Sequence, residues 1–332
     1  MTTRLEPLVT ERRIVSPLWG GTRLAGWLGL PTPHTDRIGE VWQVYDDNRV
    51  VEGEMAGRTL AEATVAWGVD LVGTRSFDRY GPDFPLLVKF LDTAAPLSVQ
   101  VHPDDDYAHS REATTGFHGK TEAWYVIDAA SDATIVHGLT RKASRAEVEA
   151  AIEAEDIEPL LARFAVSPGD AFLVPAGTIH TIGAGILLYE VQQKSDLTYR
   201  VFDFGRRDPV TSLPRRLHVD KALDVAHLGP SDSPRRSLGA ASDGRQLVVS
   251  CREFALERWT PTGTEACQTD PVTVEILTVV EGRLDLLWDA GVLNLARGDS
   301  VVLPAALGRY QVAATDAARR PVVLRAFVPD SR

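Results

Sequence analysis

The sequence predicts a mainly β protein built from two related β-barrels. Short apolar runs separated by turn residues recur along most of the 332-residue chain, as barrels and sandwiches require. Helical periodicity is confined to short stretches. A turn-and-strand motif also occurs twice, as GDAFLVPAGTIH at residues 169–180 and as GDSVVLPAAL from Gly298. Such a repetition is typical of a duplicated structural unit.

The first part of the chain contains the predicted strands of the first barrel and one short helix. The first forty residues read as strand and loop, and residues 103–119 read as a polar loop. Thr59 and Glu62 form a capping box that begins a helix ending near Trp67. Four stretches are expected to be strands because they are rich in apolar residues, namely residues 39–44, 84–91, 96–102 and 121–128.

A second capping box, Ser144 with Glu147, begins a helical insert over about residues 144–164 that is expected to cover part of a sheet. Strands resume at Gly169 and continue to about Phe204. Residues 208–242 are rich in Pro, Arg, Ser and Gly, and the domain boundary is expected there. The prediction is one barrel with its insert in residues 1–225 and a second barrel in residues 240–332.

The composition excludes several classes of protein. A net charge of -11 argues against a general binder of nucleic acid or of anionic membranes. Cys251 and Cys267 are too few for a disulfide framework and are expected to be free thiols. Neither an apolar signal region nor a long apolar run is present, so the expected location is the cytoplasm.

Four side chains are expected to converge on a metal ion. In residues 97–102 (LSVQVH), alternation places Ser98, Gln100 and His102 on one face of a strand. Lys120, Glu122 and Trp124 share a face of the next strand, and His180 stands at the corner after the first copy of the motif. Amide oxygen, carboxylate and two imidazoles suit zinc, with iron or manganese also compatible. Alternatively, His180 ends an ordinary hairpin and is only hydrogen-bonded.

A second group of charged residues follows on the neighbouring strands. Glu190 and Gln192 share a face of one strand, Arg200 lies within the next, and Arg206 follows. A lone charge of this kind is usually a solvated strand edge. Their position beside the predicted metal corner favours a functional site instead.

Four motifs in this order resemble the type I mannose-6-phosphate isomerases, which are metal-dependent members of the cupin superfamily. The motifs are LSVQVHPDDDYA, GKTEAWYVID, PGDAFLVPAGTIHTIGAG and YEVQQKSDLTYRVFDFGR. The resemblance implies a mainly β fold of two cupin-type jelly-roll β-barrels with a short helical insert in the first. It also implies an aldose–ketose isomerase that interconverts mannose 6-phosphate and fructose 6-phosphate through an enediol.

The resemblance also assigns expected roles to individual residues. The metal ligands would be Gln100, His102, Glu122 and His180, holding one Zn²⁺ per chain. Arg200 would stabilise the enediolate, and Glu190, Lys120 or a water on the metal would be the base. Expected to bind the phosphate are Lys89, Ser98 and Arg206.

Other readings and residues remain open at this stage. A non-catalytic sugar-phosphate-binding cupin, or an iron-dependent cupin oxygenase, would use a similar barrel. His109 and His118 are expected at the surface, and Asp104 to Asp106 in a strand-end turn. The second motif has no histidine in the place of His180, so the C-terminal barrel is expected to be a metal-free support. The expected partner is a small sugar phosphate, and the oligomeric state is undetermined.

Overall fold

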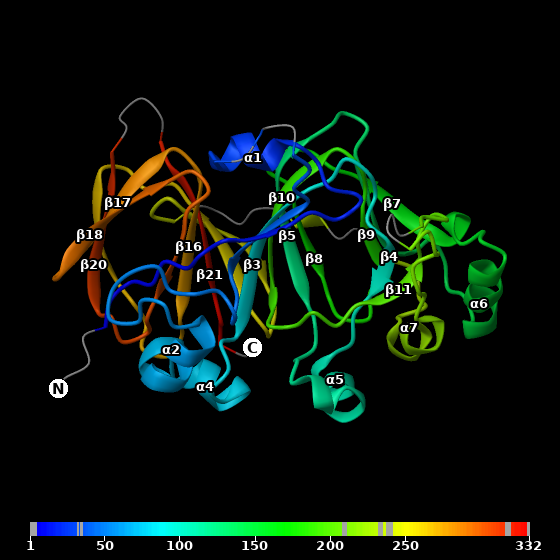
Figure 1. Cartoon of the computed structure of the whole chain (residues 1–332), viewed down its shortest axis with the longest axis horizontal. Helices are drawn as coiled ribbons and strands as arrows, with labels where there is room; N and C mark the ends of the chain where they lie inside the picture. Colours follow the sequence, from blue (N-terminus) through cyan, green and yellow to red (C-terminus); the bar gives the residue numbers. More distant parts are fainter. Residues whose placement is uncertain are drawn as a thin grey trace.

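Four antiparallel β-sheets are stacked side by side in the computed structural model (Figure 1). It describes residues 5–31, 33, 36–207, 211–231, 235–236 (backbone only), 242–315 and 320–330. Parts of the predicted domain connection, residues 208–210, 232–234 and 237–241, therefore lie outside the described residues. The same holds for the first four and last two residues of the predicted domains.

The first pair of sheets is formed by the N-terminal two thirds of the chain. The seven-stranded sheet runs in the order β1 (Arg13–Val15), β2 (Glu40–Val44), β3 (Leu86–Asp92), β10 (Ile186–Gln193), β5 (Glu122–Ala129), β8 (Ala171–Val174) and β12 (Arg235–Arg236). The facing five-stranded sheet runs in the order β11 (Tyr199–Phe202), β4 (Val99–Val101), β9 (His180–Ile182), β6 (Thr134–Leu139) and β7 (Leu161–Ala165).

The second pair repeats this arrangement. Its five-stranded sheet has the order β13 (Arg245–Ser250), β14 (Ala255–Trp259), β21 (Val322–Phe327), β16 (Glu275–Glu281) and β19 (Ser300–Leu303). Its four-stranded sheet has the order β15 (Thr264–Gln268), β20 (Arg309–Ala314), β17 (Arg283–Trp288) and β18 (Gly291–Ala296). The mainly β prediction is confirmed, with one correction. The sheets face one another as open sandwiches and do not close into barrels.

The repeated sequence motif folds into the same turn in both halves. Gly169 and Gly298 have φ values of 88° and 90°, a left-handed region that favours glycine. The aspartate after each glycine then accepts a hydrogen bond from a backbone N–H three residues earlier, Ser167 N to Asp170 Oδ2 and Ala296 N to Asp299 Oδ2, both at 2.8 Å. This shared turn supports the interpretation that the two halves are copies of one unit.

Short helices connect the strands. They are α1 (Arg23–Leu28), α2 (Leu60–Trp67), α3 (Val69–Val72), α4 (Thr74–Tyr80), α5 (Asp105–Arg111), α6 (Arg145–Glu153) and α7 (Val219–Val225), with 3₁₀ turns η1 (Ala113–Thr115) and η2 (Glu158–Leu160). Both predicted capping boxes are present, at Thr59 before α2 and at Ser144 before α6. None of the described helices has the length and apolar character that a membrane span requires.

Several element predictions were wrong. The helical insert ends at Glu153, because Glu155 adopts a left-handed φ of 54°. Residues 161–165 then pair with β6 as strand β7. Asp104 does not lie in a strand-end turn, since its carboxylate caps α5 by accepting a hydrogen bond from Tyr107 N at 2.9 Å. Residues 103–119 are not all loop, since they contain α5. Helices α1, α3, α4, α5 and α7 were not predicted, because each is too short to show a clear periodicity.

The two halves share one hydrophobic core. The outer face of the seven-stranded sheet packs against the outer face of the β13–β19 sheet, and the resulting cluster includes Leu8, Phe90 and Tyr189 together with Phe254 and Leu324. All five side chains are fully buried. The N-terminal segment also crosses into the C-terminal half, where Leu8 forms a β-bridge with Val302.

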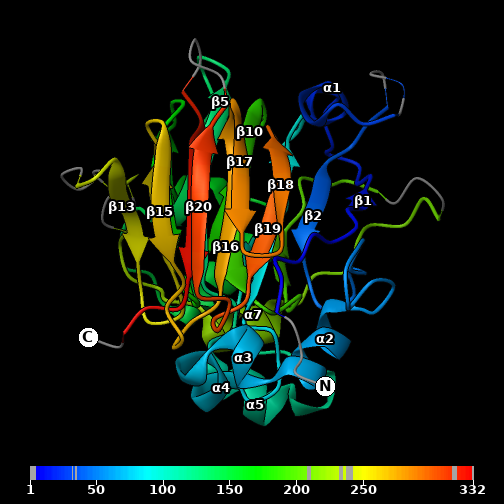
Figure 2. The same cartoon turned by 90° about the vertical axis from the view of Figure 1, so that its left-hand side faces the viewer.

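Helices α2 to α5 gather at one end of the stack (Figure 2). Within this group, α3 and α4 are attached to the C-terminal half by backbone hydrogen bonds. Val274 N donates to Val72 O, and Arg75 N donates to Val272 O, both at 2.9 Å. Gly73 lies between the two helices, where its backbone touches the segment that contains Val272. This contact fixes the helical end of the molecule against both halves.

Candidate metal centre and active site

Three potential metal ligands meet between the two N-terminal sheets. Ligand atoms of His102, Glu122 and His180 all lie within 4.8 Å of one another, and each residue is 1% exposed. Glu122 Oε1 is 3.3 Å from His102 Nε2, and Glu122 Oε2 is 3.5 Å from His180 Nε2. The side-chain amide of Gln100 completes the group, with its nitrogen 3.3 Å from His180 Nε2.

Strand pairing brings these residues together. Gln100 on β4 is directly opposite His180 on β9, and Glu122 begins β5 in the facing sheet. The period of two in β4 sends Gln100 inward, while Val99 and Val101 pack in a hydrophobic cluster on the other side. Three of the four predicted ligands therefore lie on strands β4, β5 and β9, and His102 directly follows β4.

Backbone carbonyls orient both imidazoles. His102 Nδ1 lies 2.8 Å from Leu197 O, and His180 Nδ1 lies 2.9 Å from Thr178 O. Because a carbonyl only accepts, each Nδ1 carries the proton and each Nε2 lone pair faces the cluster. This outer hydrogen bond is the arrangement that metal-binding histidines usually have.

The donor set fits a divalent cation. Glu122 Oε2 is buried and has no hydrogen-bond partner in the described part of the chain. Burial and the neighbouring His102 lower the pKa of His180 to about 3, so its imidazole is neutral and able to bind metal. A rotation of the Gln100 amide by 180° would add its oxygen as a fourth ligand, which completes the number that zinc prefers.

Lys120 lies beside the ligands and pairs with one of them. Its ammonium nitrogen is 2.7 Å from Glu122 Oε1 and 3.4 Å from His102 Nε2. Burial raises the pKa of Glu122, but Lys120, His102 and His180 together lower it well below its usual value. Glu122 is thus an anion at neutral pH, as a metal ligand must be.

A second carboxyl, Glu190, sits on β10 in the same cavity. Its Oε2 accepts a hydrogen bond from Trp124 Nε1 at 3.1 Å, and its Oε1 lies 3.1 Å from Lys89 Nζ. Burial raises the pKa of Glu190 to about 7, with a further rise from Glu122 that Lys89 and Lys120 partly offset. A carboxyl that titrates near neutral pH can accept and return a proton.

A cavity of about 260 Å³ joins these groups. Most predicted site residues line it, namely Lys89, Ser98, Gln100, Lys120, Glu122, Glu190 and Arg200. Trp19, Trp42 and Trp124 also line it, and each is buried. The cavity combines aromatic walls with a few polar groups, as sites for small ligands commonly do.

Arg200 enters the cavity from β11, where its backbone pairs with Gln100. Its Nη1 donates to Arg216 O at 2.9 Å, while its Nε is buried without a hydrogen-bond partner among the described residues. Burial and the nearby Arg215 lower the pKa of Arg200, although a guanidinium remains charged at neutral pH. The guanidinium of Arg200 is therefore a charged group in the cavity wall whose Nε can still donate a hydrogen bond.

The structure places Arg206 outside the cavity lining. Its Nε donates to Asp203 Oδ1 at 3.1 Å, and its guanidinium lies over the ring of Phe204. Arg215, which the sequence reasoning missed, lines the cavity instead, and its Nε donates to Asp203 Oδ2 at 2.7 Å. Arg215 lies in a segment without periodicity, so no pattern in the sequence could have placed it.

Glu40 is another cavity residue that the sequence reasoning missed. Its carboxylate accepts from Trp42 Nε1 at 2.8 Å and lies 3.4 Å from Lys89 Nζ. Burial raises the pKa of Glu40, but Lys89 and Trp42 lower it below its usual value. The signal was available, because alternation along residues 40–44 puts Glu40 and Trp42 on one face.

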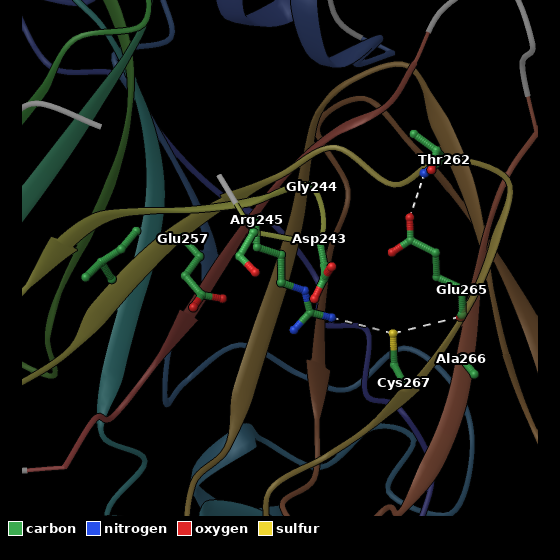
Figure 3. A pocket seen from close by; sticks show the side chains of 10 residues that line it. Asp243, Gly244, Arg245, Glu257, Thr262, Glu265, Ala266 and Cys267 are labelled. Atoms are coloured by element: carbon green, nitrogen blue, oxygen red, sulfur yellow. Dashed lines mark hydrogen bonds between the residues drawn. The ribbon is translucent and has the colours of Figure 1, made fainter. Parts of the chain in front are cut away.

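A larger cavity of about 950 Å³ lies in the C-terminal half, away from these groups (Figure 3). Its wall includes Arg245, Glu257, Glu265 and Cys267, and Arg245 Nη2 is 3.6 Å from Cys267 Sγ. Both cysteines are free, and burial raises the pKa of Cys267. Among the described residues, no group of three potential metal ligands lies in this half.

Comparisons with known proteins agree on one family. Residues 10–134 match the model of the type I phosphomannose isomerase catalytic domain, and residues 245–317 match that of the mannose-6-phosphate isomerase cupin domain. The chain is 36% identical over 321 residues to the mannose-6-phosphate isomerase ManA of Bacillus subtilis, covering 94% of this chain and 96% of that protein. It is 35% identical over 314 residues to the mannose-6-phosphate isomerase of Streptococcus mutans, covering 92% and 95%.

Solved structures give the same result. The crystal structure of the mannose 6-phosphate isomerase from Bacillus subtilis has a TM-score of 0.83 at 31% identity, and the match covers 97% of this chain and 99% of that one. The phosphomannose isomerase of Salmonella typhimurium has a TM-score of 0.77 at 16% identity, covering 98% and 100%, which shows a shared fold.

Proposed function

This chain belongs to the type I mannose-6-phosphate isomerases, and we propose that it interconverts mannose 6-phosphate and fructose 6-phosphate with one Zn²⁺ per chain. The observation that carries the proposal is the buried Glu122 carboxylate beside the imidazoles of His102 and His180, in the cavity that also holds Glu190 and Arg200. Its Oε2 has no hydrogen-bond partner among the described residues. Zinc, when bound by Gln100, His102, Glu122 and His180, polarises sugar oxygens and stabilises negative charge on them.

We assign the proton transfer to Glu190. Isomerisation removes a proton from C2 of the sugar and returns one to C1, so a single base that titrates near neutral pH can serve both steps. Glu190 is oriented by Trp124 and Lys89 and has a raised pKa of about 7. Lys120 is less free to act as the base, because its ammonium pairs with Glu122. It can donate a hydrogen bond to a sugar oxygen.

Charge on the other groups suggests their roles. Lys89 is neutralised by Glu40 and Glu190, which disfavours phosphate binding, so it positions Glu190. Ser98, Arg200 and Arg215 line the cavity and can bind anionic oxygens, Arg200 at the enediolate and the other two at the phosphate. Arg206 supports Arg215 by sharing Asp203. We also propose that the boundary between the two domains lies within residues 208–242.

The function is tested by one assay. Purified protein with mannose 6-phosphate should form fructose 6-phosphate, detected through a coupled reaction. Chelation should abolish turnover, and added Zn²⁺ should restore it, with Fe²⁺ and Mn²⁺ compared in parallel. A folded, metal-loaded sample that binds mannose 6-phosphate without turnover would instead indicate a binding protein. Oxygen consumption by the iron-loaded protein would indicate an oxygenase.

The pH dependence tests the assignment of the base. Because the carboxylate form of Glu190 is the base, kcat/KM should rise with pH through a midpoint at or below about 7, since a bound cation lowers the pKa further. Glu190→Gln should lower kcat by about 10²–10⁴-fold and remove this midpoint. Glu190→Asp should keep the midpoint with reduced kcat. A Glu190→Gln enzyme that retains both the midpoint and most of its kcat would contradict the assignment.

A further inference from the structure

A second group of potential metal ligands lies beside helix α5. Asp105 and His109 belong to this helix, and His118 belongs to the loop that leads to β5. One ligand atom from each of the three lies within 4.8 Å of the others. Asp105 and His109 are four positions apart, so they occupy the same face of the helix. His118 was expected at the surface, but it is only 7% exposed.

The two imidazoles face each other at close range. His109 Nε2 lies 3.0 Å from His118 Nδ1. A zinc ion with a tetrahedral geometry holds two nitrogens at about 2.0–2.1 Å each, which places them roughly 3.3 Å apart. A cation between the rings would therefore require them to separate only slightly. Without one, a single N–H is shared between two nitrogens.

Hydrogen bonds also fix the carboxylate of Asp105, the third potential ligand of this cation. Its Oδ1 accepts hydrogen bonds from Gly119 N and from Gln193 Nε2, both at 2.9 Å. Its other oxygen takes no hydrogen bond from the described part of the chain. Backbone and side-chain donors thus fix the carboxylate plane while one oxygen stays available for a cation.

The second ring nitrogen of His118, Nε2, independently indicates that this residue is a metal ligand. His118 Nε2 is buried and has no hydrogen-bond partner among the described residues, although Asp83 Oδ2 lies 3.3 Å away. Metal-binding histidines usually direct their second nitrogen toward a carboxylate or carbonyl, which raises the basicity of the binding nitrogen. Asp83 is itself held by Lys194 Nζ at 3.2 Å. His118 therefore has the surroundings of a ligand rather than of a surface residue.

The local charge also favours a cation. Asp46 and Asp83 both pair with Lys194, and Asp105 adds a third carboxylate, so the acidic groups outnumber this lysine. Burial lowers the pKa of His118, with a smaller opposing effect from Asp83 and Asp105. The imidazole is consequently neutral at pH 7, which is the form that binds metal.

We propose that Asp105, His109 and His118 bind a second divalent transition-metal ion, such as Zn²⁺, with a structural role. The ion would join α5 to the segment before β5. The same segment is tied to the catalytic cluster, because Ser195 Oγ donates to His118 O at 2.8 Å and Leu197 O orients His102. Three protein ligands bind more weakly than four, so this site should fill after the catalytic one.

The test is a metal titration of the full-length, chelator-stripped protein. Co²⁺ should bind in two steps, each with its own visible absorption, and Zn²⁺ should give two steps by calorimetry. In His109→Gln, the amide still hydrogen-bonds to His118, but the second step should weaken by at least about 100-fold, the upper end of the effect of outer-shell changes. His102→Gln should weaken the first step and keep the second.

Two controls guard the interpretation. His227 is exposed and lies in neither cluster, so His227→Gln should keep both steps. If His109→Gln fails to fold, Asp105→Asn serves instead, because its amide oxygen can still accept from Gly119 N, and it should also lose the second step. One equivalent in the parent protein, or a second equivalent that survives in both folded variants, would overturn the proposal.

Discussion

Replacing Glu122 with glutamine is expected to remove the catalytic metal and the isomerase activity together. Glu122 is the only anion among the proposed ligands, and its Oε2 is buried without a hydrogen-bond partner in the described chain. Losing the stabilisation that the metal provides, several kcal/mol, corresponds to a decrease of about 10³-fold or more in kcat/KM. Metal analysis and steady-state kinetics on the same sample measure both effects.

Glu122→Gln should also reduce stability, because Lys120 then keeps a buried charge without its partner at 2.7 Å. Breaking a buried ion pair from one side costs about 3–5 kcal/mol. Glu275→Gln is the matched control, since Glu275 is equally buried and pairs with Arg325 at 2.9 Å in the C-terminal half. Because Arg325 keeps Glu257 at 2.7 Å, this variant should cost less stability than Glu122→Gln, while kcat/KM and catalytic metal remain those of the parent. A Glu122→Gln protein that keeps its metal and kcat/KM would refute the ligand assignment.

A second large effect, here on stability alone, is expected from Gly73→Ala. Gly73 has a φ of 82° and ψ of 156°, a region that is open almost only to glycine. A Cβ there would lie 2.3 Å from Thr273 N and from Val272 C, both backbone atoms that cannot turn away. Backbone strain of about 1–3 kcal/mol and overpacking of about 1–3 kcal/mol act together. Denaturant unfolding should therefore give a loss of about 2–6 kcal/mol.

Gly81→Ala separates the two contributions. Gly81 ends the neighbouring helix α4 with a φ of 65° and ψ of -140°, but nothing lies within 4 Å of its would-be Cβ. It should show the backbone strain alone, about 1–3 kcal/mol. Equal losses in the two variants would mean that the contact of Gly73 with the C-terminal half contributes nothing.

The grouping of the proposed ligands could be predicted because the alternation of a strand is a strict geometric rule. Once residues 97–102 are a strand, Gln100 must face the same side as Ser98, and in the structure both line the cavity. The corner at His180 was marked by Pro175 and Gly177, residue types that indicate a turn from the local sequence alone. Strand β4 itself is shorter than predicted, Val99–Val101, but the facing is unchanged.

What could not be predicted depends on packing between distant segments. Arg215 reaches the cavity through its ion pair with Asp203, and no local pattern encodes that contact. His118 was expected at the surface because it lies in a segment read as a polar loop, yet Tyr80 from α4 covers it with a ring-to-ring distance of 4.8 Å. The open sandwich rather than closed barrel is likewise a property of how the sheets meet, to which hydrophobic alternation is insensitive.

The hydrophobic core that the two halves share links the stability of one half to that of the other. Side chains from Leu8 to Ala326 belong to one cluster, so neither half can lose its packing without exposing the apolar back of the other. Folding and unfolding should be cooperative across the whole chain, and the proposed domain boundary should not be a boundary of stability. The half without metal ligands thus contributes to the stability of the catalytic sheets, and metal binding to the folded chain should stabilise both halves together against unfolding.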